Sequence, residues 1–179
     1  MRIVIASLLA ACWTGAEPEP VIPGEPAPTT KPAVPLEVTL ERTQCFGTCP
    51  SYTVTIRADR TVMWNGDAYV TEVGARSSQV THHDLAELDR AITRAHFFEL
   101  DDNGHVPREP ACVRTGNSTS CSFSSFTLCS DTSHAIITVR RGQRVHKVDD
   151  SHCSDTPAAL IELEDAIDRI AGTGPWIGR

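Results

Sequence analysis

The chain has 179 residues and a formal net charge of −7, from 23 acidic and 16 basic side chains. The basic residues are scattered, whereas nucleic acids and anionic lipid surfaces are bound by clustered basic side chains. We therefore expect no nucleic-acid partner, and the length predicts one folded domain besides any targeting segment.

Residues 1–11 have the pattern of an export signal. Arg2 precedes an apolar run of only about nine residues, whereas a membrane-spanning helix needs roughly 20. The boundary Leu9-Ala10-Ala11-Cys12 resembles the bacterial lipobox, which implies cleavage before Cys12 and a lipid on its sulfur. An ordinary cleaved signal is the alternative. Trp13 stands where an aspartate would resemble the inner-membrane retention signal, so an outer-membrane or cell-surface location is favoured.

Residues 12–35 resemble a tether. They contain seven of the twelve prolines, and a proline-rich stretch reaches at most roughly 70 Å at about 3.1 Å per residue. The segment would hold a folded head away from the lipid surface, although an unstructured leader without a spacing role would have the same composition. Residues 36–179 then form a single disulfide-stapled domain.

The first part of this domain predicts an antiparallel β meander. A short apolar segment at 38–40 is followed by residues 51–56, in which apolar and polar side chains alternate as in a half-buried strand. A turn at 58–60 leads into a strand at 61–64. Asn65-Gly66-Asp67 predicts a further turn, with the meander continuing at 68–71.

Two amphipathic helices are predicted. Thr81 and Asp84 have the spacing of a capping box for the first helix, whose apolar face comprises Leu85, Leu88, Ile92 and Ala95. The second begins at Thr156-Pro157, with the proline at the first helical position, and ends at Gly172. Its apolar face comprises Leu160, Leu163, Ile167 and Ile170. The expected fold class is therefore α+β, with a β meander and a hairpin packed against two helices.

The predicted hairpin lies between the helices and suggests a disulfide pattern. Residues 135–140 and 143–148 flank Arg141-Gly142, and a two-residue loop there would place Ile137 opposite His146. Extending this register brings Cys129 near Cys153, within bridging distance. Nearness in sequence then favours pairing Cys45 with Cys49 and Cys112 with Cys121.

Three stretches together resemble a known bacterial family. They are "LERTQCFGTCPSYTVTIRADRTVMWNG", "HFFEL" and "SDTPAALIELEDAIDRIAGTGPWI", which ends near Trp176. The family is the domain of unknown function numbered 6438, and the resemblance implies a small exported α+β domain without an assigned activity. The chain departs from this family between residues 103 and 134, where a serine-rich loop carries Cys112, Cys121 and Cys129.

The motif Cys45-Phe46-Gly47-Thr48-Cys49-Pro50 allows three interpretations: a redox-active pair, a metal site or a structural disulfide. A C-x-x-x-C-P element resembles that of copper-delivery proteins, in which two thiolates and a histidine suit copper(I). Here Pro50 leads into a strand, so no helix dipole lowers the pKa of either thiol. A structural disulfide around Gly47 is preferred, and metal or copper handling through Cys45, Cys49 and histidines is the alternative function.

Other candidate sites have weaker patterns. The densest group of potential metal ligands is His146, Asp149, Asp150, His152 and Cys153. Of these, His146, His152 and a reduced Cys153 could bind zinc, but an oxidised Cys153 at a polar strand end is preferred. Residues 101–104 predict a turn and not a calcium loop. Seven serines at 117–134 lie near Asp131 and His134 without a G-x-S-x-G motif. The sequence thus predicts no catalytic residue, no bound metal and no cofactor.

These observations predict a lipid-anchored protein of the bacterial cell envelope that acts as a binding or structural module and not as an enzyme. The membrane contact would be the lipid on Cys12. The loop at 103–131 is the expected interaction surface for an envelope protein or ligand, because its disulfides would reduce the entropy lost on binding.

Overall fold

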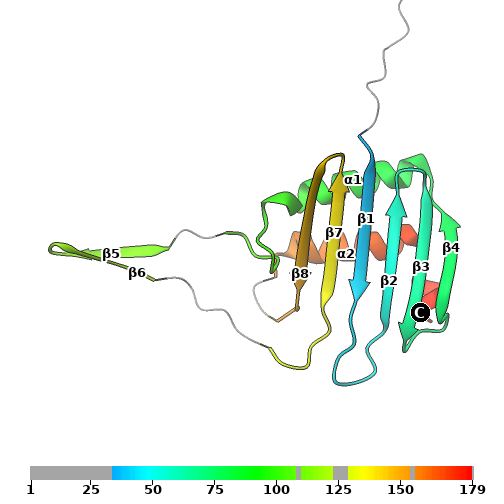
Figure 1. The fold of residues 1–179 in the computed structure, drawn as a ribbon, viewed down its shortest axis with the longest axis horizontal. Coiled ribbons are helices and arrows are strands. Elements are labelled where there is room, and N and C mark those ends of the chain that lie inside the picture. The colour runs from blue at the N-terminus through cyan, green and yellow to red at the C-terminus, as the bar shows by residue number, and fades with distance from the viewer. Residues whose placement is uncertain (1–33, 108–109, 123–128, 154–155, 179) are drawn as a thin grey trace, which may run out of the picture. The chain divides into compact units, whose positions relative to one another are not determined.

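A six-stranded antiparallel sheet with helices on one face forms the body of the protein (Figure 1). The computed structural model describes residues 34–107, 110–122, 129–153 and 156–178. The strand order is β4-β3-β2-β1-β7-β8. The strands are β1 (Leu36–Arg42), β2 (Ser51–Arg57), β3 (Thr61–Ala68), β4 (Gly74–Gln79), β7 (Ala135–Arg141) and β8 (Arg144–Asp150). The helices are α1 (His82–Arg94), the 3-10 helix η1 (Phe97–Glu99), α2 (Ala158–Ala171) and α3 (Gly174–Ile177).

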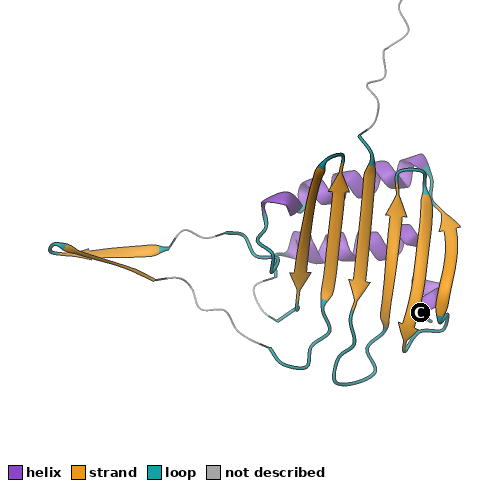
Figure 2. Ribbon diagram, viewed as in Figure 1, coloured by secondary structure: helices purple, strands orange, loops and turns teal. Residues whose placement is uncertain are grey.

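The hydrophobic core lies between the sheet and the helices α1 and α2, which both cover the same face (Figure 2). Alternate residues of each central strand point into it, as in β1, where Leu36, Val38 and Leu40 are buried. The opposite face of β1 and β2 is polar, and Thr39 and Thr55 share a hydrogen bond of 2.9 Å across it. The predicted α+β class is confirmed.

The predicted helix ends are largely confirmed. Thr81 caps α1 in a full capping box: its Oγ1 accepts from the Asp84 backbone N–H at 3.1 Å, and its own backbone N–H donates to Asp84 Oδ2 at 2.8 Å. Pro157 is the N-cap of α2 and not its first helical residue, so the helix begins one residue later than predicted, at Ala158. Gly172 ends α2 with a φ of 70°, which suits glycine.

The predicted end of the meander is wrong. The sequence predicted a turn at 65–67 and a strand at 68–71. In the structure β3 continues through Gly66 to Ala68, and the next strand, β4, begins only at Gly74. Gly66 serves close packing here, because a Cβ on it would lie 2.1 Å from the carbonyl oxygen of Glu72. β4 is an edge strand without alternating apolar residues, so the sequence contains no hydrophobic period that would reveal it.

The β7–β8 hairpin is confirmed, but its register differs by two residues. Arg141 pairs with Arg144, and Ile137 therefore faces Val148 where the sequence predicted His146. The loop is Gly142-Gln143, and the φ of 62° at Gly142 fits glycine at the first loop position. A shift of two residues keeps every side chain on its predicted face, so the core composition is unaffected.

A second, separate sheet occurs in the segment that the sequence described only as a loop. β5 (Ala111–Thr115) and β6 (Ser118–Ser122) form a two-stranded hairpin in which Cys112 lies directly opposite Cys121. Serine, threonine and asparagine dominate it, so no hydrophobic alternation marked it as a pair of strands. We call these two strands and their turn the hairpin arm.

Three disulfides are present, Cys45–Cys49, Cys112–Cys121 and Cys129–Cys153, and they are the pairs that the sequence favoured. Such bonds form and persist in oxidising compartments, so the domain is extracytoplasmic. No helix in the described part of the chain is long and apolar enough to cross a membrane. The predicted signal peptide, Cys12 and nearly all of the predicted tether lie outside the described residues.

Candidate functional site

One transverse row of the sheet carries polar side chains where a core would normally be apolar. Tyr52 pairs with Arg42, Arg42 with Ala135, and Ala135 with Asp150, so four strands contribute to one row. Arg42 has the same parity as Leu40 and Asp150 the same as Val148, and both therefore face the helices. Ala135, which lies between them in the row, has only a methyl side chain and is fully buried.

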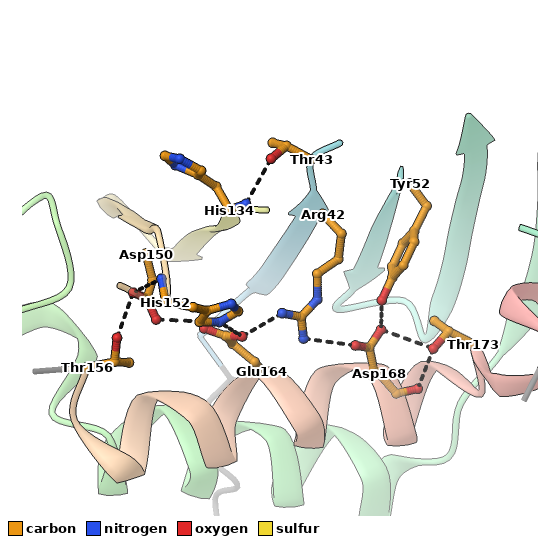
Figure 3. Close-up of polar contacts among 10 residues, drawn as sticks. All are labelled: Arg42, Thr43, Tyr52, His134, Asp150, His152, Thr156, Glu164, Asp168 and Thr173. Carbon is orange, nitrogen blue, oxygen red and sulfur yellow. Dashed lines mark hydrogen bonds and ion pairs between the residues drawn. The ribbon is translucent and has the colours of Figure 1, made fainter. Parts of the chain in front are cut away.

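The helix α2 places two carboxylates over this row (Figure 3). Glu164 and Asp168 are four residues apart and so project from the same face of the helix. Arg42 bridges them: Nη1 lies 2.6 Å from Glu164 Oε2, and Nη2 lies 3.2 Å from Asp168 Oδ2. The guanidinium thereby ties the end of β1 to the middle of α2.

Asp168 also accepts hydrogen bonds from two hydroxyl groups. Tyr52 Oη donates to Asp168 Oδ1 at 2.7 Å, and Thr173 Oγ1 donates to the same oxygen at 3.0 Å. Burial raises the pKa of Tyr52, and the charge of Asp168 raises it further, so the hydroxyl stays protonated as a donor. The Tyr52 ring stacks on Trp64 with the centroids 4.5 Å apart, which fixes its position.

Asp150 and His152 form the other end of the site. Asp150 Oδ1 accepts from the backbone N–H of His152 at 2.9 Å and from Thr156 Oγ1 at 2.8 Å. His152 Nε2 lies 2.7 Å from Glu164 Oε2 and 3.6 Å from Asp150 Oδ2. We call the ionisable groups of this site the polar cluster: Arg42, Asp150, His152, Glu164 and Asp168.

The polar cluster is partly closed to solvent. The side chains of Glu164 and Asp150 are 2% and 5% exposed, whereas that of His152 is 33% exposed. Burial alone lowers the pKa of Arg42, but Glu164 and Asp168 outweigh this effect and raise it above its ordinary value. The hydrogen bond to Glu164 raises the pKa of His152 against the opposing effect of burial. Arg42 on one side, and His152 on the other when it is protonated, thus compensate the buried Glu164 charge.

The predicted copper alternative lacks its ligands in this structure. The sulfurs of Cys45 and Cys49 are bonded to each other, whereas copper(I) coordination needs thiolates. The backbone N–H of Gly47 donates to the Cys45 carbonyl at 2.8 Å, and the Phe46 ring between the cysteines is exposed. The motif is a stapled turn that leads into β2.

The alternative zinc site of His146, His152 and Cys153 is not formed. Cys153 is bonded to Cys129, so the reduced sulfur that the site requires is absent. His146 Nε2 lies 3.0 Å from the Leu100 carbonyl oxygen. It is also four residues before Asp150 on an extended strand, a separation of roughly 13 Å. Of the three predicted ligands, only His152 belongs to the polar cluster.

The predicted interaction loop at 103–131 contains the hairpin arm. Residues 101–104 form a turn as expected, with Asp101 Oδ1 accepting from the backbone N–H groups of Asn103 and His105, both at 2.9 Å. In the arm, Ser118–Ser122 is exposed along its whole length, and Val113 is 66% exposed. The arm therefore presents its side chains to solvent.

Sequence reasoning missed three of the five cluster residues, Arg42, Glu164 and Asp168, and it considered Asp150 only as a neighbour of the predicted zinc ligands. A signal was present for Arg42 and Asp150, because each continues the buried parity of its strand after apolar residues. Glu164 likewise follows Leu163 within the apolar face of α2. A charged residue at a position where the sequence pattern predicts a core residue indicates a buried ion pair, because charged side chains are rarely buried without a partner.

A comparison with known families gives one match, to the model described as "Domain of unknown function (DUF6438)", over residues 36–171. No curated protein matches the chain. The matched segment covers most of the chain and runs from the first residue of β1 to the last residue of α2. It therefore includes the whole polar cluster and the hairpin arm. The chain belongs to the DUF6438 family of domains of unknown function.

Proposed function

We propose that this protein is a lipid-anchored binding module of the bacterial cell envelope, and that the hairpin arm takes up an extended segment of a partner protein. The two-stranded sheet of the arm, in which each strand has one outer edge, is the observation that carries this proposal. The proposal assigns no catalytic step to the chain.

The arm has two open edges. Its sheet contains only β5 and β6 among the described residues, so residues 112–115 and 118–121 pair within this sheet on one side only. Unpaired strand edges are templates for a further strand, which is a recurring mode of peptide recognition. An extended partner segment would complete the hydrogen bonding of the exposed edge.

The Cys112–Cys121 disulfide supports this role. An isolated two-stranded hairpin is marginally stable in water, whereas this one is closed by a bond between directly opposed residues. A strand edge that is already ordered loses less conformational entropy when the partner binds. The exposed side chains of Val113 and Arg114 add one apolar and one cationic contact point.

Photo-crosslinking in intact cells tests the proposed contact. A photoreactive residue at Val113 is expected to give an adduct of discrete mass, and mass spectrometry should map it to an extended segment of one envelope protein. The matched control is Val145 on β8, which is also an exposed valine on a strand and should give no such adduct. Equal adducts at both positions, or no adduct at Val113, would contradict the proposal.

The anchor is tested separately. The lipobox resemblance implies that Cys12 carries the lipid, so Cys12→Ala should move the protein from the membrane fraction to the soluble envelope fraction. The disulfides of the head should be retained in that variant, which non-reducing peptide mapping would verify. If Cys12→Ala stays with the membrane as the wild type does, the lipid on Cys12 is not the anchor.

A further inference from the structure

The polar cluster contains three potential metal ligands at one end. Asp150, His152 and Glu164 each offer one ligand atom, and these atoms all lie within 4.8 Å of one another. Figure 3 shows the three side chains converging between β8 and the first turns of α2. Asp150 and Glu164 are almost fully buried, and His152 lies at the solvent boundary.

Two buried oxygens at this point lack a hydrogen-bond donor. Asp150 Oδ2 and Glu164 Oε1 have no hydrogen-bond partner in the described part of the structure, although both residues are more than nine-tenths buried. A buried carboxylate oxygen without a partner is costly and needs an explanation. A bound cation would supply the missing interaction for both oxygens at once.

The second oxygen of each carboxylate is held in place by the protein. Asp150 Oδ1 accepts from Thr156 Oγ1 and from the backbone of His152, and Glu164 Oε2 accepts from Arg42. Such outer contacts orient metal ligands and fix which oxygen faces the ion. The arrangement therefore leaves one oriented oxygen on each carboxylate without a donor, and Asp150 Oδ2 lies 3.6 Å from His152 Nε2.

The charge of the polar cluster also favours a cation. Three carboxylates face one arginine and one histidine, so a negative charge remains even when His152 is protonated. With neutral His152 the excess of negative charge is larger. A divalent ion at the histidine end would offset it without displacing Arg42, whose guanidinium contacts the Glu164 oxygen and Asp168 on the other side.

The donor set selects the class of ion. One imidazole nitrogen and two carboxylate oxygens suit zinc and neighbouring divalent transition metals, with solvent in the remaining position. Calcium and magnesium prefer ligand sets made of oxygen alone, and copper(I) prefers thiolates. We propose that Asp150, His152 and Glu164 form a binding site for a divalent transition cation of the zinc class.

A second group of possible ligands on α1, His83, Asp84 and Glu87, is a useful contrast. Asp84 already caps the helix through Thr81, and Glu87 Oε1 accepts from Arg169 at 2.7 Å. Neither Asp84 nor Glu87 is fully buried. This group supplies the matched control for adventitious zinc binding by surface histidines.

The test is calorimetric titration of the chelator-treated, disulfide-intact protein with Zn²⁺. His152→Gln and Asp150→Asn are each expected to weaken zinc binding by at least about tenfold, in line with the effect of disturbing metal ligands and their neighbours. His83→Gln and His146→Gln should bind zinc as the wild type does. In the wild type, the ring nitrogen signals of His152 should shift on zinc addition in NMR spectra.

The variants must first be shown to be folded in the presence of EDTA. If Asp150→Asn does not fold, His152→Gln decides the question, because the His152 side chain is partly exposed and its loss leaves the core intact. Absence of zinc binding at millimolar concentration would overturn the proposal. Binding that His83→Gln abolishes and His152→Gln leaves unchanged would overturn it equally, by assigning the zinc to α1.

Discussion

Arg42 and Glu164 form an ion pair with Nη1 2.6 Å from Oε2, in which the Glu164 side chain is only 2% exposed. The pair joins the end of β1 to the centre of α2, across the layer that is otherwise filled by the hydrophobic core. A buried pair of this kind adds little net stability compared with apolar side chains of similar size, but the loss of one partner leaves a buried charge. Arg42 is therefore the residue whose substitution tests the cluster most directly.

Arg42→Met is expected to lower the free energy of unfolding by roughly 3 kcal/mol, because Glu164 and Asp168 then lose their shared cation. Urea denaturation at neutral pH measures this loss. The matched control is Arg57→Met, which removes a partner of Glu37 from an exposed ion pair and should cost less than about 1 kcal/mol. Equal losses of stability in the two variants would show that Arg42 does not compensate the charge of Glu164.

The double variant Arg42→Met with Glu164→Met is expected to recover most of the stability lost in Arg42→Met alone. The buried charge is removed together with its partner, and two apolar side chains of similar length take their place. The same urea denaturation compares the double variant with each single variant. A double variant as unstable as Arg42→Met would indicate that packing, and not charge, dominates at this position.

His152 predicts a pH-dependent contribution to stability. Its hydrogen bond to Glu164 raises the pKa of His152 in the folded state, so the stabilising contribution is fully present below the unfolded pKa of about 6.5. The contribution is lost as the pH rises through the folded pKa. In EDTA, the wild type should thus exceed His152→Gln in stability at pH 5.5, and the difference should shrink by pH 8.5. If the stability difference between the wild type and His152→Gln grew as the pH rose, the predicted pH dependence would be wrong.

Local sequence patterns were sufficient for the parts of the fold that local chemistry determines. The Thr81 capping box, the Gly172 helix end and the alternation in β2 each depend on residues within a few positions of one another. β4 and the hairpin arm are exposed and polar, so their pairing depends on neighbouring backbone and has no hydrophobic period. The register of β7 and β8 depends on which residues form the turn. Because Gly142 is the first loop residue and not the second, the observed register differs from the predicted one by two residues.

The polar cluster was not predictable in the same way. Its members come from β1, β8, α2 and the residues after β8, and Arg42 and Asp150 meet through the register of two strand pairs, β1 with β7 and β7 with β8. Only Asp150 and His152 had been considered, and they were grouped with His146 and Cys153 because these residues are near in sequence. Distance along the chain hides such a site: Arg42 and Glu164 are 122 positions apart.

The disulfides are predicted to act on different parts of the molecule. Cys129→Ser with Cys153→Ser should lower the free energy of unfolding by roughly 3 kcal/mol, because the bond closes a loop across the β7–β8 hairpin next to His152. Cys112→Ser with Cys121→Ser should leave the unfolding of the six-stranded sheet unchanged but speed hydrogen exchange in the hairpin arm. Urea denaturation and exchange measured by NMR separate the two effects. Loss of sheet stability in the Cys112 and Cys121 variant would show that the arm belongs to the cooperative unit.

Gly66 is predicted to be the most demanding backbone position of β3. A Cβ there would lie 2.1 Å from the Glu72 carbonyl oxygen and 3.0 Å from Trp64 Nε1, and that same carbonyl accepts from Trp64 at 2.9 Å. Gly66→Ala must therefore move the backbone that connects β3 to β4, at a cost of roughly 3 kcal/mol. Asn65→Ala is the matched control, because Asn65 is exposed on the opposite face and its loss should cost less than about 0.5 kcal/mol. Thermal unfolding followed by tryptophan fluorescence measures the stability of both variants. A Gly66→Ala variant as stable as Asn65→Ala would contradict the prediction, because it would show that the Glu72 carbonyl can move away without loss of its hydrogen bond from Trp64.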